Sequence, residues 1–182
     1  MVKTVKTNLT LYRTVEEKKY WDLRNDVAIY RGKIIDETLI IEQAIDNIIA
    51  AYFCKVEKIN DAFSMIFNKG HIGFLAKENI LKLILSKPEY ENFGKKYKTI
   101  KNDITKIRTL RNSLAHSKIY STSENISGYD GNKLPIFKDT NGGKKEDMGF
   151  RMRELKSQIG FMNAVFKGLL ELYKIIKQEQ PK

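Results

Sequence analysis

Residues 34–54 read IIDETLIIEQAIDNIIAAYFC and give the clearest indication of the fold. Apolar side chains recur there at steps of three and four residues, the spacing that places them on one face of an α-helix. The residues assigned to that face are Ile35, Leu39, Ile45, Ile49, Tyr52 and Phe53. Four acidic residues, from Asp36 to Asp46, interrupt the stretch, so it is too polar to be a membrane span. The sequence therefore predicts a long amphipathic helix that buries its apolar face in a core.

The same spacing and the usual helix-end signals predict helices along most of the remaining chain. A capping-box pattern begins a helix near 14–31, which Gly32 is expected to end. Asn60 is expected to cap the next helix. Further helices are predicted near 61–69, 74–86, 95–118 and 150–178. In the last of these, Gly160 and Gly168 are expected to let a neighbouring element approach closely.

The segment 119–149 has a different character from the helices around it. It is rich in Ser, Gly, Asn and Asp, with the turn signals YDGN at 129–132 and NGG at 141–143. Short β-type pieces flank these turns, so we expect a β-hairpin or an irregular loop inserted before the last helix. The expected fold class is all-α, a bundle of four to six helices in a single domain, 1–182, with 119–149 as an insertion.

The composition limits the kinds of partner and environment. Lys and Arg number 33 against 22 Asp and Glu, a formal charge of +11 that favours polyanionic partners such as RNA and equally fits a lysine-rich solvated surface. Cys54 is the only cysteine, so an intramolecular disulfide and a cysteine-based metal site are excluded. The first residues lack the apolar core of a secretory signal. We expect a cytoplasmic protein that is not in a membrane and needs no metal or cofactor.

The predicted helix 95–118 carries the sequence RNSLAH at residues 111–116. On a projection of 100° per residue, Arg108, Arg111, Asn112 and His116 share one face beside the buried one. The residues assigned to the buried face are Ile100, Ile104, Ile107, Leu110 and Leu114. An ordinary surface helix also gathers its charges on one side, so the spacing alone fits both a site and a solvated face.

The residue types suit the cleavage of a phosphodiester. A histidine side chain ordinarily has a pKa of about 6.5, so it can take or give a proton near neutral pH. A guanidinium binds phosphate oxygens through two hydrogen bonds and stabilises charge that develops on them. RNA supplies its own nucleophile, the 2′-hydroxyl. Asn112, one helical turn before His116, could hold the imidazole or a phosphate oxygen.

RNSLAH resembles the R-x(4–6)-H signature of HEPN domains, whose members are all-α bundles with this motif toward the end of a late long helix. The resemblance implies a metal-independent endoribonuclease that leaves 2′,3′-cyclic phosphate ends. It also implies a homodimer in which two motifs face one cleft, in a toxin–antitoxin or phage-defence setting with an antitoxin or defence-system partner protein. In these roles His116 is the general base or acid, Arg111 holds the scissile phosphate and Asn112 positions it. Some members carry Tyr two positions after the histidine, where this sequence has Lys118, so a nucleotidyltransferase antitoxin is less well supported.

Other residues are expected to assist. Lys101, Lys106 and Arg108 lead into the motif and Tyr120 follows it, and all four are candidates for RNA binding, although the lysines equally fit a solvated helix face and Tyr120 a packing role. Glu42 lies in register with apolar residues of 34–54, so we expect it to be partly buried. It either pairs with Arg108 or Arg111, or reaches solvent on a tilted helix.

Two other functions remain open at this point. The chain could be a non-catalytic HEPN module that binds RNA, a nucleotide or a partner protein without turnover. It could also be a helical interaction protein in which RNSLAH has no catalytic meaning.

His71, between two glycines, fits a turn residue better than a metal ligand because no ligand-forming residue lies at a suitable spacing.

Overall fold

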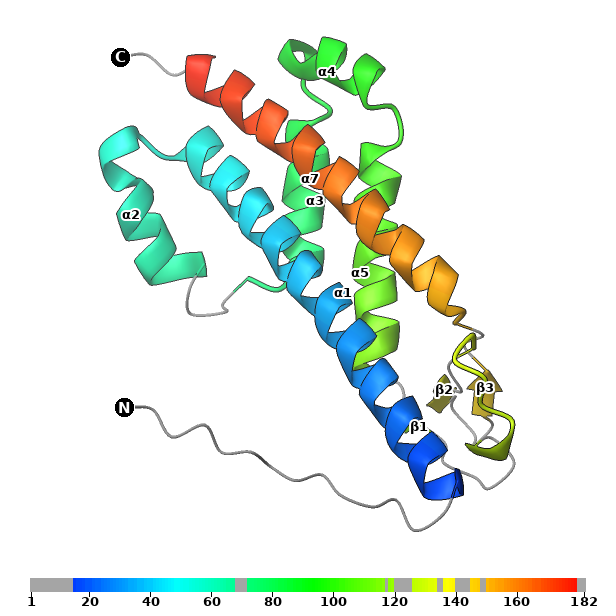
Figure 1. Ribbon diagram of the computed structural model, residues 1–182. Helices are drawn as coiled ribbons and strands as arrows, with labels where there is room; N and C mark the ends of the chain where they lie inside the picture. The colour runs from blue at the N-terminus through cyan, green and yellow to red at the C-terminus, as the bar shows by residue number, and fades with distance from the viewer. Residues whose placement is uncertain are drawn as a thin grey trace, which may run out of the picture.

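The computed structural model describes residues 15–67, 72–116, 118–119, 126–133, 136–139, 145–147 and 150–179. Helices make up most of these residues, as the predicted all-α class requires (Figure 1). In chain order the helices are α1 (Val15–Phe53), η1 (Val56–Lys58), α2 (Ile59–Ala62), η2 (Phe63–Phe67), α3 (Phe74–Ile84), η3 (Pro88–Tyr90), α4 (Glu91–Lys96), α5 (Ile100–His116) and α7 (Met152–Glu179). The strands are β1 (Lys118–Ile119), β2 (Ile136–Asp139) and β3 (Lys145–Asp147).

The first helix is longer than the sequence predicts. α1 runs through Gly32, so the expectation that this glycine ends a helix is wrong. A glycine inside a helix costs about 1 kcal/mol relative to alanine. Val27 and Ile34, on either side of it, are buried in the core, and full burial of such a side chain contributes about 1.5–3 kcal/mol. Packing therefore outweighs the weak helix propensity of the glycine.

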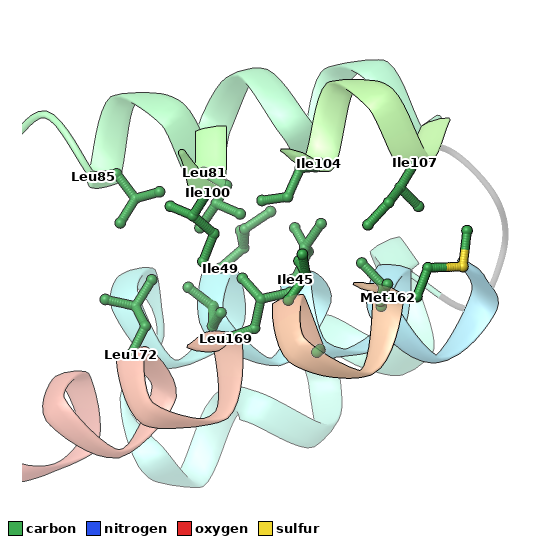
Figure 2. Packing of buried hydrophobic residues seen from close by; sticks show 14 of the residues in the cluster. Ile45, Ile49, Leu81, Leu85, Ile100, Ile104, Ile107, Met162, Leu169 and Leu172 are labelled. Carbon is green, nitrogen blue, oxygen red and sulfur yellow. The ribbon is translucent and has the colours of Figure 1, made fainter. Parts of the chain in front are cut away.

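The core lies between four helices. α1 and α7 make the most extensive contact, and α3 and α5 pack against α1 and against each other (Figure 1). Figure 2 shows side chains of these helices meeting, among them Ile45 of α1, Leu81 of α3, Ile104 of α5 and Leu169 of α7, all of them fully buried. The helix that carries RNSLAH is therefore one wall of the core.

The buried face of α1 differs from the predicted one. Leu39 and Phe53, both assigned to the core, are 50% and 66% exposed. The buried positions between Leu23 and Ile48 are Leu23, Val27, Ile34, Thr38, Ile41, Ala44, Ile45, Asp46 and Ile48. Helices α3, α5 and α7 all contact α1, so its buried arc is wider than a single stripe. Spacing alone cannot choose the centre of such an arc when apolar residues lie on several sides.

One predicted glycine contact is present and the other is not. A Cβ on Gly168 of α7 would lie 3.1 Å from Cε1 of Tyr97, so the expected close approach is confirmed there. Nothing lies within 4 Å of the same position on Gly160, and the expectation is wrong for that residue. The hydroxyl of Tyr97 donates to Oε2 of Glu171 at 2.8 Å, which fixes the start of α5 against α7.

The predicted helix ends agree with the structure for two helices and differ from it for two others. α3 and α7 match their predicted positions closely. The helix expected to be capped by Asn60 begins earlier, with Lys58 at the N-cap position and no side-chain cap, so the prediction for Asn60 is wrong. The predicted helix 95–118 is divided, because α4 ends at Lys96 and α5 begins at Ile100.

Three short strands form an antiparallel sheet next to the end of α5. β1 pairs with β2 and β2 with β3, so Lys118 lies opposite Phe137 in the register. They occupy part of the segment 119–149, of which the structure describes residues 119, 126–133, 136–139 and 145–147. The described part is tied to α1, because the Tyr129 hydroxyl donates to Asp26 Oδ2 at 2.5 Å and Lys19 Nζ donates to the Ser127 carbonyl at 2.6 Å.

Candidate active site on helix α5

The core packing of α5 sets the direction of its polar face. Ile100, Ile104, Ile107 and Leu114 are buried, and Leu110 packs against the same core, so the predicted apolar face of this helix is confirmed. Apolar contacts along most of the helix fix its rotation about its own axis. The side chains next to the buried stripe therefore have fixed directions as well.

The three motif residues lie at the C-terminal end of α5. Arg111 and Asn112 are half-buried, and His116 is exposed at the last position of the helix. Nη1 of Arg111 donates to Oδ1 of Asn112 at 3.0 Å. His116 follows Asn112 by one helical turn, and within the described residues no hydrogen bond joins its imidazole to either neighbour. The structure thus brings Arg111 and Asn112 together and leaves His116 open to solvent.

This arrangement contains two of the groups that metal-independent RNA cleavage uses, a guanidinium and an imidazole. A half-buried guanidinium held by a neighbour loses little conformational freedom when it binds a phosphate, and partial burial strengthens its attraction for the anion. An exposed imidazole one turn beyond Asn112 can exchange a proton with a bound hydroxyl group.

Glu42 does not pair with the arginines of α5. It is partly buried, as expected, with 21% of its side chain exposed, but its Oε1 accepts a hydrogen bond from Lys77 Nζ at 2.8 Å. Arg108 donates its Nε to Glu78 instead. The predicted pairing of Glu42 with Arg108 or Arg111 is therefore wrong. The reason is the position of α3, which packs against both α1 and α5 and supplies the partner for each.

Lys77, Glu42 and Asp46 form a buried group that we call the Lys77 cluster. Only 5% of the Lys77 side chain is exposed, and its Nζ donates to Asp46 Oδ2 at 2.8 Å in addition to Glu42. Burial alone would lower the pKa of Lys77, but the hydrogen bonds to the two carboxylates outweigh it and raise that pKa above its ordinary value. Burial raises the pKa of Asp46, and the hydrogen bond from Lys77 offsets this only in part.

Glu78, Lys82, Thr105 and Arg108 form a second group, the Glu78 cluster. Oε1 of Glu78 accepts from Lys82 Nζ at 2.6 Å and from the Thr105 hydroxyl at 2.5 Å, while Oε2 accepts from Arg108. Burial alone would raise the pKa of Glu78, but these three hydrogen bonds outweigh it and lower that pKa. Arg108 precedes Arg111 by three residues, so this cluster fixes the face of α5 on which the motif lies.

Neither cluster was found from the sequence, although a signal was present. Lys77 and Glu78 are adjacent charged residues inside the apolar stretch FLAKENILKLI of α3. A charged residue is almost never fully buried without a partner, so their place in that stretch indicates partners on two neighbouring helices. The identity of those partners depends on which helices α3 contacts, and the local sequence does not contain that information.

The residues expected to bind RNA have different surroundings. Lys101 Nζ donates to the Ser86 hydroxyl at 2.7 Å, and Lys106, which is exposed, lies 3.3 Å from Asp103 Oδ1. Arg108 belongs to the Glu78 cluster. Tyr120 lies outside the described residues, as does His71. The RNA-binding role of all these side chains stays a prediction.

Within the described ranges, no group of three or more His, Cys, Asp or Glu side chains is arranged to hold a metal ion. In the same ranges, no helix is both long enough and apolar enough to cross a membrane. No protein-family model matches the chain, and no similar chain was found among curated proteins or solved structures. The likeness to HEPN domains therefore rests on RNSLAH and its helical setting, and it stays a prediction.

Proposed function

We propose that the protein is a metal-independent endoribonuclease of HEPN type that cleaves RNA with Arg111 and His116. The observation that carries this proposal is the end of α5, where Arg111 is half-buried and bonded to Asn112 while His116 is exposed one turn further on. The formal charge of +11 supports a polyanionic substrate. A toxin–antitoxin or phage-defence setting, with an antitoxin or defence partner, belongs to the same proposal.

In the proposed reaction the 2′-hydroxyl of a ribose attacks the adjacent phosphorus. One imidazole removes the proton from that hydroxyl, the bond from phosphorus to the 5′-oxygen breaks, and the leaving oxygen receives a proton. The products are a 2′,3′-cyclic phosphate and a 5′-hydroxyl. Arg111 stabilises the negative charge that develops on the phosphate oxygens. A homodimer would bring a second His116 to the same phosphate, so that one histidine acts as base and the other as acid.

The test is cleavage of a labelled RNA in the presence of EDTA. We expect wild-type protein to leave cyclic phosphate ends, and His116→Ala and Arg111→Ala each to lower the rate by about 100-fold or more. Arg153→Ala is a matched control, because this exposed residue does not belong to the proposed site, and it should cleave like wild type. If the two motif variants also cleave like wild type, or if EDTA abolishes cleavage, the proposal is wrong.

A second candidate is a HEPN module that binds RNA without cutting it. It is favoured by the exposed position of His116 at the last residue of α5, where solvent surrounds the imidazole. This module would bind labelled RNA, would lose affinity in Arg111→Ala, and would leave the RNA intact after long incubation. Size-exclusion chromatography with light scattering distinguishes the two further, because the enzyme needs the dimer for its second histidine.

A further inference from the structure

Two hollows adjoin near α4 and the C-terminal end of α1. These two elements lie at the end of the bundle opposite the strands (Figure 1). One has a volume of about 590 Å³ and its lining includes Lys87, Lys95 and Lys98. The other has a volume of about 480 Å³ and its lining includes Tyr52, Phe53, Ile80 and Leu83. Both are also lined by Ser86 and Lys87, so a basic surface continues directly into an apolar one.

The lysines of the basic hollow are largely free to bind an anion. Nζ of Lys87 and Nζ of Lys98 have no ion pair or hydrogen bond with any other described residue. Lys95 pairs with Glu91 at 2.8 Å, but both side chains are exposed and such a pair is worth little. By contrast, Lys96 of the same run is bonded to Glu171. Lys87 and Lys98 are therefore available to bind an anion, whereas Lys96 is already bonded within the fold.

The apolar hollow exposes large side chains that the fold does not cover. Phe53 and Leu83, which line it, are 66% and 68% exposed. The Phe53 ring is held by Tyr52, whose ring lies edge-on at 4.8 Å, and Tyr52 in turn lies against Tyr90 at 6.3 Å. A supported and exposed aromatic ring beside unpaired lysines is the combination that binds single-stranded nucleic acid, in which bases stack on rings and phosphates lie over cations.

We infer that this surface, called here the Phe53–Lys87 surface, binds an unpaired segment of RNA, with a base against Phe53 and phosphates over Lys87 and Lys98. The inference rests on the proposed function, since it names how that enzyme would hold its substrate. RNA is the occupant that matches both halves of the surface, since its phosphates oppose the lysines and its bases can stack on the ring. α5 has 17 residues and is about 25 Å long, so this anchor lies far from His116.

The test measures the affinity of a labelled single-stranded RNA for the His116→Ala protein by fluorescence anisotropy at several salt concentrations. Adding Lys87→Glu and Lys98→Glu should weaken binding at least tenfold and reduce the salt slope by about 1.4, which is 0.7 for each lost phosphate contact. A matched pair of reversals at Lys33 and Lys167, which are exposed and line neither hollow, should have a clearly smaller effect. Equal effects of the two pairs would overturn the inference.

Phe53 separates stacking from simple charge attraction. Phe53→Ala should weaken single-strand binding about tenfold, Phe53→Trp should restore it, and duplex RNA should be affected by neither. Loss of duplex and single-strand binding to the same degree would overturn the inference. So would competition by an acidic polypeptide that depends on Phe53 as strongly as RNA does, because the surface would then fit a protein segment.

The two proposals can fail separately. If wild-type protein does not cleave RNA but the His116→Ala protein binds it in the Phe53-dependent manner, the catalytic proposal fails and the RNA site stands. If wild-type protein cleaves RNA and the Lys87→Glu, Lys98→Glu variant shows an unchanged KM, the RNA site fails and the catalytic proposal stands. The expected result is a raised KM with an unchanged kcat, because the anchor is distant from the reacting phosphate.

Discussion

Two adjacent charged residues of α3, Lys77 and Glu78, are bonded to side chains of different helices. The clusters that they form carry net charges of opposite sign. In the Lys77 cluster one buried ammonium faces two carboxylates, those of Glu42 and Asp46. In the Glu78 cluster one buried carboxylate faces two cations and a hydroxyl, from Lys82, Arg108 and Thr105. The first cluster therefore has an excess of negative charge and the second an excess of positive charge.

The difference appears in how fully each carboxylate is bonded. Both oxygens of Glu78 accept hydrogen bonds, and its pKa is lowered. Oδ1 of Asp46 is buried without a hydrogen-bond partner among the described residues, and its pKa is raised. Burial of a charge costs free energy that only suitable partners offset. We conclude that the buried charge of α3 is more fully bonded on the side of α5, the helix with the motif, than on the side of α1.

Removal of the single cation of the Lys77 cluster should have the largest effect. Lys77→Met leaves two partly or fully buried carboxylates without a cation, so the free energy of unfolding at pH 7 should fall by about 3–5 kcal/mol. Urea unfolding followed by circular dichroism measures this loss. Lys58→Met, which breaks an exposed pair with Asp61, is the matched control and should change stability by at most about 1 kcal/mol. Equal losses in the two variants would show that the buried position adds nothing.

Removal of the central charge of the Glu78 cluster should cost less. After Glu78→Gln, the side chains of Lys82 and Arg108, which are 34% and 21% exposed, can still reach water. The expected loss is about 1.5–3 kcal/mol, the usual contribution of hydrogen bonds to a charged group. The same urea experiment measures it, with Glu91→Gln in the exposed pair with Lys95 as control. A loss larger than that of Lys77→Met would reverse the comparison between the clusters.

The two clusters also mark the limit of what the sequence could predict. The positions of α3 and α7 and the buried face of α5 follow from local spacing, and so does the placement of Arg111, Asn112 and His116 near the end of one helix. Partners of buried charges do not follow from it, because Glu42 and Lys77 are 35 residues apart and meet only after α3 packs on α1. The wide buried arc of α1 was missed for the same reason.

The same limit applies to the Phe53–Lys87 surface. The spacing of Phe53 predicts a core residue, yet Phe53 is exposed because α1 turns a different face to its neighbours. The sequence shows that the lysines near 95–101 form a basic run. It does not show which of them are bonded, because Lys96 bonds to Glu171 and Lys101 to Ser86, and both partners come from other parts of the chain.

The smallest effect is expected from Asp46→Asn, and its dependence on pH identifies its cause. Because the pKa of Asp46 is raised above its ordinary value of 3.8, the folded protein binds this proton more tightly than the unfolded chain does. Protonated Asp46 therefore stabilises the folded protein fully below pH 3.8, and this stabilisation is lost as pH rises through the raised pKa. Asparagine remains neutral, so the variant should be more stable than wild type at pH 7.

The difference in stability between Asp46→Asn and wild type should shrink as pH falls toward 4. The lowered pKa of Glu78 acts in the opposite direction, since its stabilisation is present above 4.5 and lost as pH falls through the lowered value. Both proteins contain Glu78, so its effect cancels in the difference between their unfolding free energies. Glu42→Gln is the matched control, because it removes the better solvated carboxylate of the same pair and should lower stability at pH 7. An Asp46→Asn variant that is less stable than wild type at pH 7 would mean that the Lys77 cluster needs both carboxylates, and the proposed imbalance between the two sides of α3 would be wrong.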